Sequence, residues 1–234
     1  MKSIITFGAG SQDYYDAVKR LTKQSTELEL FDNIIGYTDK NLKNDNIFWE
    51  KHSNFITNNK RGYGYWIWKP YLIKKTMDNM KDGDILLYLD CGCEINIKKK
   101  ENIKQYFELI ENEYIIGSFN SLEICYNKMD LIIKLDMLKD EYLNSIQHQS
   151  GAILFLVCDK TRHIVNEWYN LACDYHNIDD TPSIYNNLDC FIEHRHDQSI
   201  FSLLTKKYKV FSEYSISNCV EYCRNKTGIS IIDC

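Results

Sequence analysis

The feature that most constrains the fold is an unbroken apolar run, Ile85–Leu89, that ends at Asp90. A strand with one solvent-exposed face alternates apolar and polar residues. An apolar residue at every position instead indicates a strand that is buried on both faces. Such strands lie in the middle of mostly parallel sheets that are covered by helices. The run therefore predicts an α/β protein, with Asp90 at the carboxyl end of a central strand.

Short apolar runs and helical spacings alternate along the rest of the chain. This alternation predicts an α/β sandwich with a mostly parallel central sheet flanked by helices, built as a single domain over residues 1–234. The expected strands are 4–7, 34–38, 85–89, 114–119 and 152–157, and the expected helices are 13–30, 41–58, 70–80, 101–113, 128–143, 160–175 and 197–207.

The composition argues against several other classes of protein. A net charge of −5 and a pI of about 5.7 do not suggest a nucleic-acid partner. No apolar stretch reaches the roughly 20 residues of a transmembrane segment, and the apolar start of MKSIITFGAG is too short for a signal peptide. Nine cysteines without an export signal predict reduced thiols in a cytoplasmic protein.

Carboxylates follow the central strand in the segment YLDCGCEI. If the strand continued past Asp90, its period of two would place Asp90, Gly92 and Glu94 on one side. Two carboxylates around a position without a side chain leave room for a divalent cation, and Mn²⁺ or Mg²⁺ prefers such oxygen ligands. The segment thus predicts a metal site that a phosphate would share. The alternative is a strand end with solvated acids.

A second unusual segment is RGYGYWIWKPYLI, residues 61–73. Its two glycines would let the backbone approach a ligand, and rings such as Tyr65 offer flat stacking faces. Arg61 and Lys69 could meet the charges of a diphosphate, aided by the dipole of a helix that starts near Pro70. The alternative is that these rings are core packing before a helix.

A third segment, EHRHDQSIFSLL at residues 193–204, crowds polar groups before an apolar helical face. Histidine, arginine and acid packed this densely are more typical of a site than of a surface. The segment HQSGAILFLV adds polar residues at the entry to a strand. The candidates in these two segments are His194, His196, Asp197 and Gln198, and His148, Gln149, Ser150 and Gly151.

The order of DILLYLDCGCE, QSGAILFL and HDQSIFSLL resembles GT-A-fold glycosyltransferases over about residues 1–205, with 206–234 as a C-terminal extension. The likeness is to the glycogenin-like, galactosyltransferase-like and capsular sugar transferase groups, including small bacterial and giant-virus proteins with a GYGYWIWKP segment. In such enzymes a strand-end Asp-x-Asp holds the metal. Asp90 matches the first acid, but Gly92 stands at the second, so Glu94 would have to substitute.

The resemblance implies transfer of a hexosyl or deoxyhexosyl group from a UDP- or GDP-linked donor to a glycan hydroxyl. Asp197 and Gln198 would be catalytic, and Asp90, Glu94 and His194 would hold Mn²⁺ or Mg²⁺. The donor would contact Thr6, Phe7, Tyr37, Thr38, Arg61, Tyr65, Lys69, Asp90, Gln149, Ser150, Gly151 and His196.

The likeness of the DQ segment, Asp197 and Gln198, to the family mildly favours a retaining reaction. Because the amide of Gln198 is a weak nucleophile, a same-face displacement assisted by the departing phosphate fits better than a covalent route, while Asp197 would be the base of an inverting route. One alternative is a Rossmann-type enzyme that uses a dinucleotide or S-adenosylmethionine, although Asp13 occupies the third glycine position after FGAG. Another is a non-catalytic module that binds nucleotide sugars.

Overall fold

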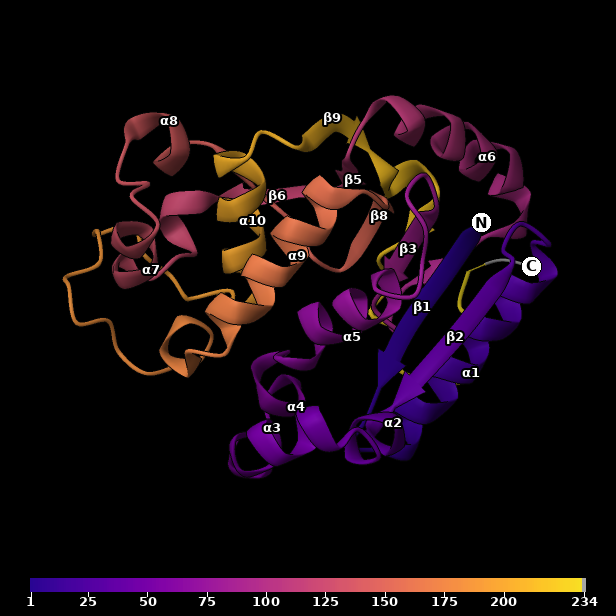
Figure 1. Cartoon of the computed structure of the whole chain (residues 1–234), viewed down its shortest axis with the longest axis horizontal. Coiled ribbons are helices and arrows are strands. Elements are labelled where there is room, and N and C mark those ends of the chain that lie inside the picture. Colours follow the sequence, from indigo (N-terminus) through magenta and orange to yellow (C-terminus); the bar gives the residue numbers. More distant parts are fainter. Residues whose placement is uncertain (233–234) are drawn as a thin grey trace.

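Within residues 1–232, which this computed structural model describes, six strands form the main sheet in the order β2-β1-β3-β8-β5-β9 (Figure 1). Five of them run parallel to one another, and β8 runs antiparallel to both of its neighbours. The expected α/β sandwich with a mostly parallel sheet is confirmed. The strands are β1 (Lys2–Gly8), β2 (Asn33–Thr38), β3 (Ile85–Leu89), β5 (Ile115–Gly117), β8 (Ala152–Leu156) and β9 (Phe211–Ser215).

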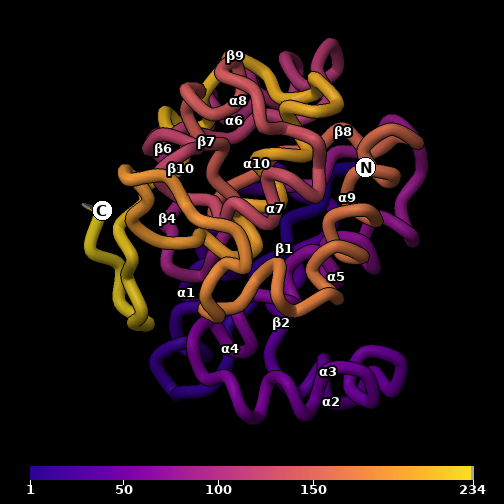
Figure 2. Tube along the Cα trace, turned by 90° about the vertical axis from the view of Figure 1, so that its left-hand side faces the viewer, coloured from indigo at the N-terminus to yellow at the C-terminus, as the bar shows by residue number. Residues whose placement is uncertain are grey.

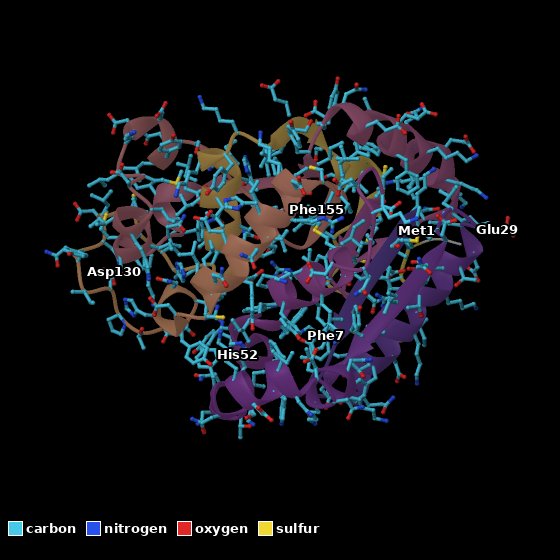
Figure 3. All side chains as sticks on the ribbon, in the orientation of Figure 1. Met1, Phe7, Glu29, His52, Asp130 and Phe155 are labelled. Carbon is cyan, nitrogen blue, oxygen red and sulfur yellow. The ribbon has the colours of Figure 1, made fainter. Side chains whose placement is uncertain are left out.

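Both faces of the sheet are buried, as the unbroken apolar runs require. Successive residues of a strand point to opposite faces, so Ile4 and Ile5 belong to different core clusters. Phe7 and Phe155 pack on the face covered by α3, α5, α9 and α10 (Figure 3). Helices α1 and α6 cover the other face. The bounds are α1 (Gln12–Glu27), α3 (Asn46–Asn58), α5 (Trp68–Met77), α6 (Lys100–Leu109), α9 (Asp159–Ala172) and α10 (Asp197–Lys207).

Two of the expected helices are divided. The side chain of Asp45 accepts a hydrogen bond from the Phe48 N–H and caps a new helix, so the segment 41–58 holds two helices. The segment 128–143 also contains two short helices. The shorter elements are α2 (Asp39–Lys43), α4 (Gly62–Tyr65), α7 (Met129–Lys134) and α8 (Asp140–Leu143), with 3₁₀ turns at Ile97–Lys99, Ile110–Asn112, Glu123–Cys125, Tyr175–Asn177 and Ile216–Asn218.

The C-terminal part of the chain is built into the fold. Strand β9 forms an edge of the main sheet, and β10 (Val220–Glu221) pairs with β4 (Glu94–Ile95). The chain then runs beside α1 and β4 (Figure 2), where the buried Arg20 donates to the carbonyls of Asn225 and Thr227. A further pair, β6 (Phe119–Leu122) and β7 (Ile146–His148), lies apart from the main sheet.

No helix among residues 1–232 combines the length and the apolar character needed to cross a membrane.

Candidate active site

The site lies at the sheet edge where β3 ends. Because β8 is antiparallel to β3, its amino end meets the carboxyl end of β3, and Leu89 pairs with Ala152. The Asp90 N–H donates to the Gly151 carbonyl at 2.8 Å. A methyl group on Gly151 would lie only 3.1 Å from Asp90 Oδ2, so a glycine keeps room beside this carboxylate.

Lys69, in the first turn of α5, joins two carboxylates. Its Nζ lies 3.3 Å from Asp90 Oδ1 and 3.0 Å from Asp197 Oδ2. It also donates to the backbone carbonyl and to Oγ of Ser150, both at 3.2 Å. The structure therefore brings together Lys69, Asp90, Ser150 and Asp197, which lie far apart in the sequence.

The two carboxylates differ in their environment. The Asp90 side chain is 40% exposed, whereas that of Asp197 is 5% exposed. Burial raises the pKa of Asp197, although Lys69 and a 2.8 Å hydrogen bond from Ser150 favour its charged form. Burial lowers the pKa of Lys69, but the two carboxylates outweigh this effect, and its pKa is raised overall. With Lys69 charged, two carboxylates around one ammonium group form a site with an excess of negative charge.

Lys69 engages one oxygen of each carboxylate. The other oxygens, Asp90 Oδ2 and Asp197 Oδ1, accept no hydrogen bond from the residues that the structure describes. These two oxygens are therefore the acceptors that the site offers to a ligand.

Gln198 and Gln149 are held by neighbouring polar groups. Gln198 accepts a hydrogen bond from the Ser150 N–H at 3.3 Å and donates to Gln147 Oε1 at 2.6 Å. Gln149 accepts from the hydroxyl of Ser118 at 2.6 Å. The side chain of Gln198 is thereby fixed beside Asp197.

Sequence reasoning missed three residues of the site. The Tyr88 hydroxyl donates to Asp90 Oδ1 at 2.5 Å, Gln147 holds Gln198, and Trp168 Nε1 donates to the Asp197 carbonyl at 2.9 Å. Tyr88 carries the one polar group among the side chains of β3, so the sequence could have indicated that Tyr88 belongs to the site. Nothing in the sequence relates Trp168, in the middle of α9, to Asp197.

The position and contacts of Glu94 contradict the expected metal site. Strand β3 ends at Leu89, so the assumed continuation that would align Glu94 with Asp90 is wrong. Glu94 is fully buried and accepts hydrogen bonds from Gln24, Asn225, Ser230 and the backbone of residue 231. Burial raises its pKa, but these donors outweigh burial and lower the pKa of Glu94 to about 2. Its carboxylate binds the C-terminal segment instead of a cation.

His194 is also committed to other contacts. Its Nδ1 accepts from the Lys128 N–H at 3.2 Å, and its Nε2 lies 2.7 Å from the Asn177 carbonyl, to which it can donate. Burial lowers the pKa of His194 to about 3. Neither nitrogen remains for a metal, and residues 1–232 contain no group of three histidine, cysteine or acidic side chains suited to a cation. The set Asp90, Glu94 and His194 therefore does not fit a metal held by the protein.

Arg61 lies in a second cluster, where acidic side chains pair with it. Its guanidinium contacts both oxygens of Asp180 at 3.0 Å and Glu193 at 3.3 Å. His196 belongs to the same cluster, where its ring packs on Trp66 and Tyr65 with centroids 5.2 and 5.1 Å apart. The cluster adjoins the Lys69 site through the backbone, because His196 precedes Asp197.

The side chains expected around the nucleotide base mostly contact other parts of the protein. Phe7 is 3% exposed and stacks on Trp68 with centroids 4.0 Å apart, and Thr6 is buried. The Tyr37 hydroxyl hydrogen-bonds Thr76 at 3.2 Å, and Thr38 caps α2. A base cannot lie on the Phe7 ring in this arrangement.

No model of a known protein family and no curated protein matches this chain. Solved structures do match it, and several of them are glycosyltransferases. Apo mouse xyloside xylosyltransferase 1 is 11% identical, with a TM-score of 0.49 over 93% of this chain and 86% of that one. The galactosyltransferase LgtC, solved with donor and acceptor sugar analogues, is 13% identical, with a TM-score of 0.49 over 89% of this chain and 72% of that one.

A glycosyltransferase involved in glycosylation of the major capsid of PBCV-1 is 10% identical, with a TM-score of 0.41 over 73% of this chain and 65% of that one.

Proposed function

We propose that this protein is a glycosyltransferase that moves a sugar from a nucleotide-diphosphate donor to a hydroxyl group of a glycan. The observation that carries the proposal is the convergence of Asp90 and Asp197 on the buried Lys69 at the carboxyl edge of the sheet. Ligands collect at this edge in open α/β sheets. The sequence resemblance supports a hexosyl or deoxyhexosyl group and a UDP- or GDP-linked donor.

The charges of the site suit the sugar better than the diphosphate. In glycosyl transfer the bond from the anomeric carbon to phosphate breaks, and positive charge develops at that carbon. Preorganised carboxylates stabilise such charge. The free oxygens of Asp90 and Asp197 would face it, while Lys69 holds both carboxyl groups in place. Lys69 is 3% exposed and already has four oxygen partners, so it is a positioning residue.

A retaining displacement is the reaction that we favour. The amide of Gln198 is held beside Asp197 by Ser150 and Gln147 and is too weakly basic to act as a proton acceptor. The acceptor hydroxyl would attack from the face that the diphosphate leaves, and its proton would pass to a departing phosphate oxygen. Asp197 Oδ1 would be the base in an inverting reaction.

The test is nucleotide release from a panel of UDP- and GDP-sugars. Asp197→Asn and Asp90→Asn should each lower the release rate about 100-fold or more, because each removes preorganised negative charge. Asp82→Asn, which changes an exposed carboxylate paired with Arg162, is the matched control and should retain the wild-type rate. Binding of a nucleotide sugar without any release would favour the non-catalytic module instead.

A further inference from the structure

The C-terminal segment reaches the edge of the sheet at which the site lies. Strand β10 pairs with β4, and beyond it the Asn225 N–H donates to the Gly92 carbonyl at 2.9 Å. A Cβ on Gly92 would lie 3.3 Å from the Cα of Arg224, so the two backbones are in close contact. Residues 220–225 therefore lie against the chain that follows Asp90.

A buried cation holds the segment in this place. Arg20 donates through Nη1 to the carbonyls of Asn225 and Thr227 at 3.2 and 2.6 Å. It donates through Nη2 to the carbonyls of Cys91 and Cys93 at 2.7 and 3.0 Å. Hydrogen bonds from a charged donor are stronger than those between neutral groups. Arg20 thus joins the C-terminal segment firmly to the turn that follows β3.

Tyr222 is the residue of this segment that lies beside the carboxylate of Asp90. A methyl carbon on Gly151 would be 3.1 Å from Asp90 Oδ2 and 3.9 Å from Tyr222 Cε1. The free carboxylate oxygen and the tyrosine ring therefore border the same small space, which stays open because Gly151 has no side chain. Tyr222 is 37% exposed and the Asp90 side chain 40% exposed, so a ligand can reach both.

The hydroxyl group of Tyr222 is used within the protein. The Ser118 hydroxyl donates its one proton to Gln149 Oε1 at 2.6 Å, so it accepts the hydrogen bond from the Tyr222 hydroxyl, which lies 2.7 Å away. Burial raises the pKa of Tyr222, which favours the protonated hydroxyl that this bond requires. The hydroxyl fixes the ring in place, and the ring is the part of the side chain that a ligand can contact.

A ring beside a free carboxylate oxygen suits a sugar. A pyranose carries hydroxyl groups on its rim and C–H groups on its faces, so the carboxylate can accept from a hydroxyl while the ring packs on a face. Other rings near the site are committed to packing, because Tyr65 and Trp66 contact His196 and Phe7 stacks on Trp68.

We infer that the ring of Tyr222 is the surface on which the transferred sugar packs, while a hydroxyl of that sugar donates to Asp90 Oδ2. The inference rests on the proposed function for the identity of the sugar as the transferred group, but not for the binding of a pyranose. It makes the C-terminal segment a part of the sugar site. A side chain at position 151 would fill the space between the two groups and exclude the sugar.

The experiment is saturation-transfer NMR of the full chain with the methyl pyranosides of glucose, galactose, mannose and xylose, and with sorbitol, which has hydroxyls but no ring face. At least one pyranoside should give a signal, and sorbitol should not. Tyr222→Leu should weaken the signal about fivefold or more, whereas Tyr222→Phe, which keeps the ring, should retain at least half of it. Tyr214→Leu changes another exposed tyrosine, on β9, and should retain the full signal.

Gly151→Ala tests the same site without changing the C-terminal segment. Gly151 has no positive φ, so alanine suits the backbone, but its methyl group would occupy the space beside Asp90 Oδ2. This variant should also weaken the signal about fivefold or more. A full signal in Gly151→Ala or in Tyr222→Leu would overturn the inference, as would equal losses in Tyr222→Leu and Tyr222→Phe, a loss in Tyr214→Leu, a signal from sorbitol, or no signal from any pyranoside.

Nucleotide release from UDP- and GDP-sugars is measured on the same samples, so that the two proposals fail separately. If the pyranosides bind as expected but no donor is consumed, the sugar site at Tyr222 stands and the proposed function fails. If the donor is consumed while pyranoside binding is unchanged by Tyr222→Leu and Gly151→Ala, the proposed function stands and the assignment of Tyr222 fails.

Discussion

At the scale of single residues, the central interaction is the contact of Lys69 with Asp90 and Asp197. A buried ion pair is weak evidence for stability, since desolvation opposes the Coulombic gain. Removing one partner is different, because it leaves a buried charge without compensation. The contact is therefore best explained as an arrangement that holds two acidic side chains close together at a ligand-binding edge.

Replacing Lys69 by methionine should lower the free energy of unfolding by about 3–5 kcal/mol, because Asp197 loses its buried cation. It should also abolish nucleotide release. Lys74→Met is the matched control on the same helix, since Lys74 pairs with Asp78 at the surface, and it should cost less than about 1 kcal/mol. Urea denaturation measures both variants. A Lys69→Met protein as stable as the wild type would show that the acids do not depend on this cation.

Glu94 gives a prediction for acid stability. Its folded-state pKa of about 2 lies below the ordinary 4.5. A depressed carboxylate pKa contributes stability that is present above pH 4.5 and is lost as the pH falls towards 2. Over this window the wild type should lose about 3 kcal/mol more than Glu94→Gln, which cannot titrate.

The measurement for Glu94 is urea denaturation at several pH values. Glu101→Gln is the control, because Glu101 is an exposed residue that pairs with Lys104, and it should follow the wild-type pH profile. Parallel pH profiles for the wild type and Glu94→Gln would mean that the hydrogen bonds of Glu94 do not favour its charged form.

At the scale of elements, the segment GYGYW forms a left-handed turn. All five residues 62–66 have positive φ, including Tyr63, Tyr65 and Trp66, for which this conformation is unfavourable. The glycines serve the turn itself, not a close approach to a ligand. The turn presents Tyr65 and Trp66 to the His196 ring, so backbone strain positions part of the second cluster.

Two glycines with the same φ test this turn. Gly64 has φ +85° and an added Cβ would lie 2.6 Å from Ile56 Cγ1, whereas Gly83 has φ +86° and open space around it. Gly64→Ala should therefore cost about 3 kcal/mol through strain and overpacking, and Gly83→Ala about 1 kcal/mol through strain alone. Urea denaturation compares them. Equal losses would indicate that the turn relaxes around the added methyl group.

Sequence patterns predicted the elements better than their directions and ends. The bounds of β3 and of α10 agree with the expectation, because an unbroken apolar run and a sharp polar-to-apolar change mark them. The apolar run of β8 indicates that the strand is buried, but it does not indicate in which direction the strand runs. Its antiparallel pairing with β3 was therefore not predicted. The sequence also did not show that β3 ends at Leu89. The assumed continuation of the strand therefore placed Glu94 beside Asp90.

At the scale of the whole molecule, the site depends on contacts between distant segments. Lys69, Asp90, Ser150 and Asp197 come from four segments, and the sequence indicated that each was polar near a strand or helix end. The acids that neutralise Arg61 lie more than 100 residues away, in a loop without a regular pattern. Pairing of this kind depends on the tertiary fold and could not be predicted from the local sequence.

The arrangement of the whole site also predicts how metal and nucleotide should act. Glu94 and His194 are used elsewhere, so a divalent cation finds at most Asp90 among the expected ligands. Because stabilisation follows ligand concentration relative to Kd, 1 mM MnCl₂ alone should shift the melting temperature by less than about 1 °C. A nucleotide sugar at 100 times its Kd should add about 2.7 kcal/mol, or roughly 5–10 °C for a chain of this size. A shift of several degrees with MnCl₂ alone would instead require a preformed metal site in the protein, and would contradict the assignment of these two side chains to structural contacts.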